Sequence, residues 1–164
     1  MPGFEVFGEE EKQQALEVFD TGVLFRYEFG DQRRGVYKVR EFEQAFAKYT
    51  GAAHAQAVTS GTAALKVALA ALGVGIGDEV ITQGFTFVAT WEAIFDIGAV
   101  PVFTEVDQTL NMDPDDLEKK ITDKTKAVFG EVVGNPKLNV LDIEKAAAIA
   151  HDNGIPLIVD NTAT

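Results

Sequence analysis

The first segment with residues suited to chemistry is TSGT, at residues 59–62. It precedes residues 63–72, AALKVALAAL, a run of strong helix formers. A helix that begins here would combine free backbone N–H groups, the positive end of the helix dipole and two hydroxyls, which together make an anion site. Gly61 would let a phosphate group approach the backbone closely. An ordinary Ser/Thr helix cap is the alternative interpretation.

Three further segments follow apolar runs. Asp160 ends PLIVD, where its carboxylate could hold a cationic group or a metal, or could cap a turn. Asn135 stands before a proline after AVFGEVV, so its amide would project at the same edge, although Asn-Pro also favours a simple turn. Residues 84–91, GFTFVATW, would place an aromatic ring against a planar ligand or bury it in the core.

Alternating strands and helices must position these segments. We predict β-strands at residues 55–59, 79–82, 100–106, 126–132 and 156–160. Helices are predicted at residues 63–72 and 87–97, from Asp113-Pro114 onward, and at residues 141–151. This order predicts the α/β class, with a mostly parallel sheet flanked by helices. In such sheets ligands bind beyond the carboxyl ends of the strands.

The first 50 residues have a different pattern. Helices are predicted at residues 9–19 and 38–49, and VLFRYEFGDQRRGVYK lies between them. This part of an acidic protein holds a group of basic residues, Arg26, Arg33, Arg34, Lys38 and Arg40. The segment is either a solvated loop or an arm that contacts a substrate or a second subunit.

Composition excludes several classes of protein. The 164 residues are 46% hydrophobic and carry a net charge of −12, which argues against nucleic acid or a membrane surface as the main partner. Cysteine is absent and only two histidines are present, so we expect no disulfide, no cysteine nucleophile and no metal centre. The chain has neither an apolar run of ~20 residues nor a signal-like N-terminus, so we expect a cytoplasmic protein.

Several stretches together resemble the pyridoxal-phosphate (PLP) enzymes of fold type I. Over residues 1–130 the chain resembles the sugar aminotransferases of the DegT/DnrJ/EryC1/StrS family, and MPGFEVFGEEEK resembles the branch that makes 8-amino-3,8-dideoxy-octulosonate. The matching stretches are VREFEQAFAKYTGAAHA, TSGTAALKVALAALGVGIGDEVI, FTFVAT, GAVPVFTEVD and ITDKTKAV. Residues 130–164 are similar instead to Cys/Met-metabolism enzymes such as O-acetylhomoserine sulfhydrylase, so we consider a chimera.

The resemblance implies an aspartate-aminotransferase-like fold and a PLP site. Residues 51–164 would form part of the large domain, residues 1–50 a helical arm, and the remainder of the large domain and the small domain would be absent. Glycine and threonine of TSGT would hold the cofactor phosphate, an aromatic ring would stack on the pyridine, an asparagine would bind its phenolic oxygen, an aspartate would pair with its nitrogen, and a threonine would lie against its face. These residues are Gly61, Thr62, Phe87, Asn135, Asp160 and Thr162.

The resemblance also implies a reaction. Complete relatives would form homodimers and transfer an amino group from glutamate or glutamine to a keto-sugar. In both families the Schiff-base lysine lies beyond the position of Thr164, and no lysine here occupies the matching motif. We therefore expect the front part of a longer enzyme, with no catalytic lysine and no activity alone. The alternatives are a Cys/Met-type lyase or sulfhydrylase and a non-catalytic, truncated or engineered folding module.

Overall fold

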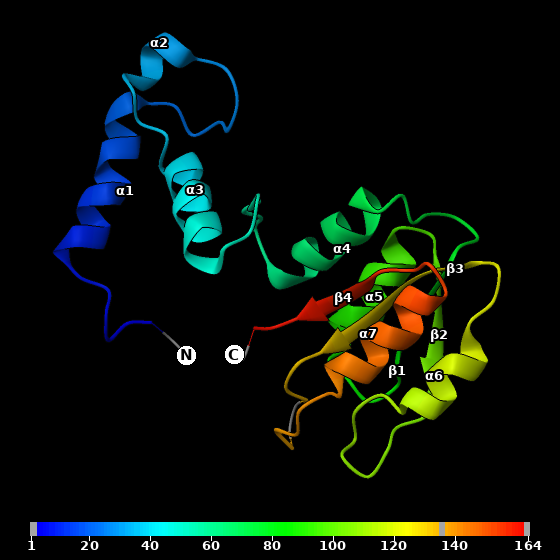
Figure 1. Cartoon of the computed structure of the whole chain (residues 1–164). Coiled ribbons are helices and arrows are strands. Elements are labelled where there is room, and N and C mark those ends of the chain that lie inside the picture. Colours follow the sequence, from blue (N-terminus) through cyan, green and yellow to red (C-terminus); the bar gives the residue numbers. More distant parts are fainter. Residues whose placement is uncertain (1–2, 135–136, 163–164) are drawn as a thin grey trace. The chain divides into compact units, whose positions relative to one another are not determined.

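The computed structural model describes residues 3–134 and 137–162. It divides the chain into two compact units, Met1–Ala57 and Val58–Thr164. The first unit contains α1 (Glu9–Thr21), α2 (Gly30–Arg33) and α3 (Lys38–Thr50) (Figure 1). The helices predicted at residues 9–19 and 38–49 are present, whereas the short helix α2 had no sequence prediction.

Capping explains where α1 begins and ends. The N–H of Gly8 donates to the carboxylate of Glu11 at 2.7 Å, and three glutamates occupy the first turn, where the helix dipole favours negative charge. The helix ends at Gly22, whose φ of 68° is the left-handed conformation that glycine adopts without strain.

The second unit is built on a parallel sheet. The described residues form β1 (Glu79–Gln83), β2 (Val100–Thr104), β3 (Thr125–Glu131) and β4 (Leu157–Asp160), in the spatial order β2-β1-β3-β4. All three pairings are parallel. The predicted α/β class with a parallel sheet flanked by helices is confirmed.

Four helices cover these strands; the first precedes β1, and the other three connect successive strands. They are α4 (Gly61–Ala71), α5 (Ala89–Asp96), α6 (Pro114–Lys120) and α7 (Ile143–Asp152). Local side chains fix three of the helix starts: Ser60 accepts from the N–H of Ala63, Asp113 from that of Asp115, and Asp142 from that of Lys145. Because these caps act within a few residues, the sequence could locate the helices without tertiary information.

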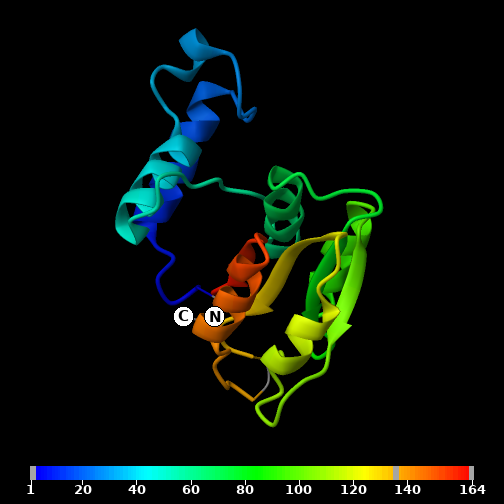
Figure 2. The same cartoon turned by 45° about the vertical axis from the view of Figure 1, so that its right-hand side comes forward.

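The core lies on both faces of the sheet. On one face Ile81 and Val128 pack with residues of α6 and α7, including Leu117. On the other face Val80 and Phe129 pack in a second cluster with residues of α4 and α5. Figure 2 shows the helices on the two sides of the strands. Successive residues of a strand point to opposite faces of the sheet. Because helices cover both faces here, both sets of side chains are apolar, which explains the continuous apolar runs in the sequence.

The predicted strand at residues 55–59 is wrong, because the structure has no strand there. A strand requires a neighbouring strand for its backbone hydrogen bonds. This segment contains instead the boundary between the two units, after Ala57. The N–H of Ala57 donates to the side chain of Glu43 at 2.7 Å.

Among the described residues, no helix is both long enough and apolar enough to cross a membrane.

Candidate functional site

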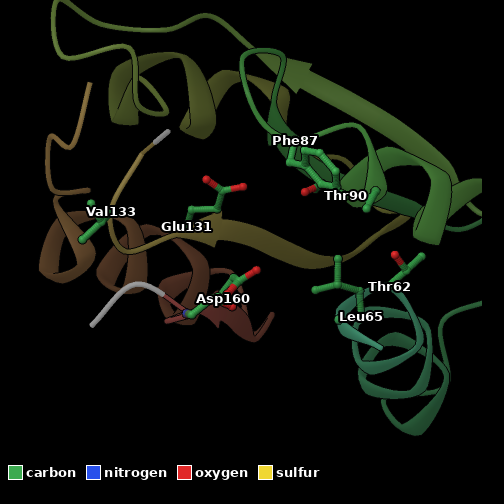
Figure 3. A pocket seen from close by; sticks show the side chains of 10 residues that line it. Thr62, Leu65, Phe87, Thr90, Glu131, Val133 and Asp160 are labelled. Carbon is green, nitrogen blue, oxygen red and sulfur yellow. Dashed lines mark hydrogen bonds between the residues drawn. The ribbon is translucent and has the colours of Figure 1, made fainter. Parts of the chain in front are cut away.

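A pocket of the second unit lies where the sheet connections diverge. β1 and β3 are neighbours, but the chain runs from β1 through α5 to β2 on one side, and from β3 through α7 to β4 on the other. Such a switch point opens a crevice beyond the carboxyl ends of the strands. This pocket of about 360 Å³ is lined by residues at or just after the ends of β1, β3 and β4 and by the start of α4 (Figure 3).

Most of the residues that the sequence singled out lie together in this pocket. They come from α4, from the segment after β1 and from the end of β4, which are far apart in the chain. Asn135 lies outside the described residues. The predicted site residues that line the pocket are Gly61, Thr62, Phe87, Asp160 and Thr162.

The start of α4 offers two backbone donors to the pocket. Ser60 engages the N–H groups of Ala63, at 3.1 Å through its hydroxyl, and Ala64, at 3.0 Å through its carbonyl. Within the described residues, the N–H groups of Gly61 and Thr62 donate to no protein group. A Cβ added at Gly61 would meet no atom within 4 Å, so the space beside this backbone is open. The helix start fits a phosphate group.

Asp160 places a carboxylate at the strand edge of the pocket. Its Oδ1 accepts the N–H of Thr162 at 2.9 Å and the Thr162 hydroxyl at 2.5 Å. The turn-cap interpretation of Asp160 is therefore confirmed for one carboxylate oxygen. These bonds fix the orientation of the side chain, and the second oxygen has no bonding partner among the described residues. That oxygen can accept a proton-bearing ring nitrogen.

Glu131, at the end of β3, is a pocket residue that the sequence analysis missed. Its Oε1 accepts the hydroxyl of Thr86 at 2.6 Å, and Thr86 also lies within 3.3 Å of the Thr90 hydroxyl. Figure 3 shows Glu131 and Asp160 on neighbouring strands beside the same pocket. The signal that marked Asp160, a carboxylate at the end of a buried strand, was present at Glu131 too.

Apolar side chains complete the walls. Phe87, Leu65 and Val133 line the pocket. Phe87 is 66% exposed, which leaves an aromatic surface available to a planar ligand. The pocket therefore combines an anion cradle, an aromatic surface and a carboxylate, which are the groups that fit the phosphate, ring and pyridine nitrogen of PLP. Within residues 3–134 and 137–162, no cluster of three or more His, Asp or Glu side chains could hold a metal ion.

Known proteins are similar to this chain in sequence and in fold. The chain is 40% identical over 156 residues to the spore coat polysaccharide biosynthesis protein SpsC of Bacillus subtilis, covering 94% of this chain and 37% of that protein. It is 42% identical over 132 residues to an L-glutamine:2-deoxy-scyllo-inosose aminotransferase of Streptomyces lividus, covering 80% and 30%. The chain thus spans about a third of the length of these curated relatives.

A solved structure shows the same architecture. NtdA from Bacillus subtilis with bound cofactor PMP superimposes with a TM-score of 0.76 at 28% identity, over 92% of this chain and 32% of that one. The sequence profile of the DegT/DnrJ/EryC1/StrS aminotransferase family matches residues 8–164. This range includes residues 130–164, the segment that the sequence analysis likened to Cys/Met-metabolism enzymes. The chain belongs to the DegT/DnrJ/EryC1/StrS aminotransferase family.

Proposed function

We propose that this pocket binds PLP and that the whole protein transfers an amino group from glutamine or glutamate to a keto-sugar or a related cyclic ketone. The observation that carries the proposal is the convergence of Gly61, Thr62, Phe87 and Asp160 on one pocket at the switch point of the sheet. Family membership supports the reaction class, and the inosose aminotransferase supports glutamine as donor.

The two ends of the pocket would orient the cofactor. Gly61 and Thr62 would donate backbone hydrogen bonds to the phosphate at the positive end of α4. Asp160, held by Thr162, would keep the ring nitrogen protonated, because an opposite charge beside a titratable group favours its charged form. When bound in this state, the cofactor supplies an electron sink for negative charge that develops at the reacting carbon.

Glu131 would face the ring from the neighbouring strand. Its hydrogen bond to Thr86 fixes one carboxylate oxygen and ties the end of β3 to the segment after β1. Phe87, from this same segment, would cover the ring and exclude water from one face. These contacts position and shield the cofactor, but no lysine lines the described pocket. The proposal therefore includes no turnover by residues 1–164 alone.

The proposal is tested by a structure and a titration of this chain with PLP. We expect the phosphate within hydrogen-bonding distance of the Gly61 and Thr62 N–H groups, and we expect pyridoxal, which lacks the phosphate, to bind at least tenfold more weakly. A phosphate bound elsewhere, with the start of α4 free, would contradict the assignment. A dominant lysine adduct after borohydride reduction, together with amination of a keto-sugar, would show that residues 1–164 suffice for catalysis.

The other predictions from the sequence concern the alternative reactions, the origin of the chain, its location and its oligomeric state. The lyase or sulfhydrylase alternative and a chimeric origin depend on residues 130–164 alone, and an amino-acid substrate panel on the complete protein separates them from the aminotransferase. A cytoplasmic location and a homodimer stay predictions. The exposed apolar side chains of the first unit, among them Phe42, Phe46 and Tyr49 on α3, support the homodimer.

A further inference from the structure

A second pocket lies within the first unit and shares no residue with the candidate PLP site. It has a volume of about 280 Å³ and is lined by the end of α1, residues 23–27, α2 and the first half of α3. Its charged lining residues are four cations and one carboxylate, in a chain with a net charge of −12. These residues are Arg26, Arg33, Lys38, Arg40 and Glu43.

Two of the four cations are neutralised by carboxylates. Nη2 of Arg26 lies 2.5 Å from Oε1 of Glu43, and Nζ of Lys38 lies 2.6 Å from Oε2 of Glu17. The same oxygen of Glu43, Oε1, also accepts a hydrogen bond from the Ala57 N–H. These two pairs therefore contribute little net charge to the pocket.

The other two cations have no carboxylate within ion-pair distance in the described part of the chain. Arg33 is only 7% exposed, and its guanidinium donates to the neutral carbonyl oxygens of Glu28, at 2.9 Å, and Tyr27, at 3.4 Å. Its guanidinium carbon lies 5.4 Å from the centre of the Tyr37 ring, and that of Arg40 lies 4.4 Å from the same centre. Two guanidinium groups thus contact one tyrosine ring.

A buried cation without a counter-ion is costly, and it marks a place where an anion would be stabilised. Guanidinium groups match the oxygens of phosphate in paired hydrogen bonds. Arg33 has five donors, of which the two carbonyl oxygens use only part. The remaining donors of Arg33, together with those of Arg40, could serve one phosphate group.

The backbone that carries Arg33 is strained in a way that supports a binding role. Glu28, Phe29 and Arg34 have φ values of 60°, 52° and 51°, which non-glycine residues seldom adopt. Strain of this kind persists where the surrounding structure enforces it, and it clusters at ligand-binding segments. Phe25 and Tyr27, close in sequence to these residues, also line the pocket and are 60% and 65% exposed.

We propose that the pocket of the first unit binds a small phosphate ester, with the phosphate on Arg33 and Arg40 and the attached ring against Phe25 and Tyr27. Two sources share this chemistry, a nucleotide and a sugar phosphate. Lys38 and Arg26 keep their carboxylate partners when the ligand binds. The phosphate therefore receives its charge compensation from Arg33 and Arg40, which have no carboxylate within ion-pair distance in the described part of the chain.

The test is isothermal titration of the whole chain with UMP, glucose 1-phosphate, inorganic phosphate and uridine. We expect one of the two esters to bind, inorganic phosphate to bind at least tenfold more weakly because it lacks the ring, and uridine not to bind. The tighter ester identifies the source. If neither ester binds, or if uridine binds as well as UMP, the proposal fails.

Four variants locate the binding. Arg40→Gln should weaken it at least tenfold, and it should fold, because Arg40 is exposed and makes no hydrogen bond within the described residues. Arg33→Lys keeps the positive charge but loses the planar guanidinium group with its paired donors. It should also weaken binding of the ester at least tenfold. Lys12→Gln, the same charge change outside the pocket, and Gly61→Val, in the other pocket, should leave affinity within twofold. Loss of binding in Gly61→Val with no effect of Arg40→Gln would overturn the proposal.

Discussion

Glu131 and Asp160 are register partners at the carboxyl ends of the adjacent parallel strands β3 and β4. Each carboxylate accepts a threonine hydroxyl, from Thr86 at 2.6 Å and from Thr162 at 2.5 Å, and both line the pocket that begins at α4. The pocket therefore has two carboxylates on its sheet side and a positive helix start on its other side. This charge separation would bind a ligand with one anionic and one cationic end in a single orientation.

Gly61→Val should weaken binding of PLP to the chain at least tenfold. The added side chain would occupy the open space beside the N–H groups at the start of α4. Apart from the adjacent residues and the backbone of α4 itself, no protein atom lies within 4 Å of the Cβ position. The variant should still fold for the same reason. Titration by absorbance measures the affinity, and Gly75→Val, at another glycine with open space, is the control. Equal PLP affinity in both variants would rule out a phosphate at α4.

Asp160→Asn should lower PLP affinity about ten- to a hundredfold, because a hydrogen bond to a charged group contributes roughly 1.5–3 kcal/mol. The asparagine oxygen can still accept from the Thr162 N–H, so the turn is kept while the charge is lost. Asp152→Asn, at an exposed aspartate at the end of α7, is the matched control and should change the affinity less than threefold. Glu131→Gln, which removes a carboxylate from the next strand, should lower the affinity less than Asp160→Asn does. A larger loss in Glu131→Gln than in Asp160→Asn would mean that Glu131 is the partner of the ring nitrogen.

Leu117→Ala should reduce the free energy of unfolding by about 2–5 kcal/mol, the range for a leucine truncated in a packed core. Leu117 has 0% exposure in the cluster between α6, α7 and the sheet. Urea denaturation followed by circular dichroism measures the change. Val67→Ala, on α4, where the valine is 46% exposed, should cost less than 1 kcal/mol because little packing is lost there. An equal decrease in the free energy of unfolding in the two variants would show that Leu117 does not lie in the packed core.

The Arg26–Glu43 pair should make stability depend on pH below the ordinary glutamate range. The hydrogen bond from the Arg26 guanidinium, followed by that from the Ala57 N–H, lowers the pKa of Glu43. A lowered pKa stabilises the folded state above the ordinary value near 4.3, and this contribution is lost as the pH falls through the folded-state pKa.

Glu43→Gln should therefore lower the melting temperature at pH 7, and the difference from the wild-type chain should shrink toward pH 3. Thermal unfolding at both pH values measures it. Glu118→Gln, at an exposed glutamate on α6, is the charge-matched control and should have little effect at either pH. A difference for Glu43→Gln that is the same at pH 7 and pH 3 would contradict the ionic origin.

The chain should self-associate in solution. Phe42, Phe46 and Tyr49 of α3 are 57%, 48% and 90% exposed, and uncovered apolar faces of this kind favour association with a partner. Light scattering after size-exclusion chromatography should give the mass of a dimer, and Phe46→Ser should shift the population toward monomer. A monodisperse monomer at high concentration would contradict this prediction.

Local interactions explain what could be predicted from the sequence. The caps Ser60, Asp113 and Asp142 act on backbone groups two or three residues away, so the starts of α4, α6 and α7 are encoded locally. The apolar runs of β1 and β3 reflect a sheet buried on both faces. Together with the resemblance to PLP enzymes, these signals identified the fold class and, among the described pocket residues, Gly61, Thr62, Phe87, Asp160 and Thr162.

Only the tertiary structure decided the remaining features, because they depend on partners distant in sequence. Residues 55–59 have the composition of a strand, but no strand pairs with them. Glu131 joins the pocket because β3 and β4 pair in a register that places it beside Asp160. Arg33 is buried, with no carboxylate partner among the described residues, because residues 27–37 fold around it. The sequence by itself predicted most of the helices and strands and five of the residues that line the pocket. The pairing of segments distant in the chain decided which charged side chains lie side by side.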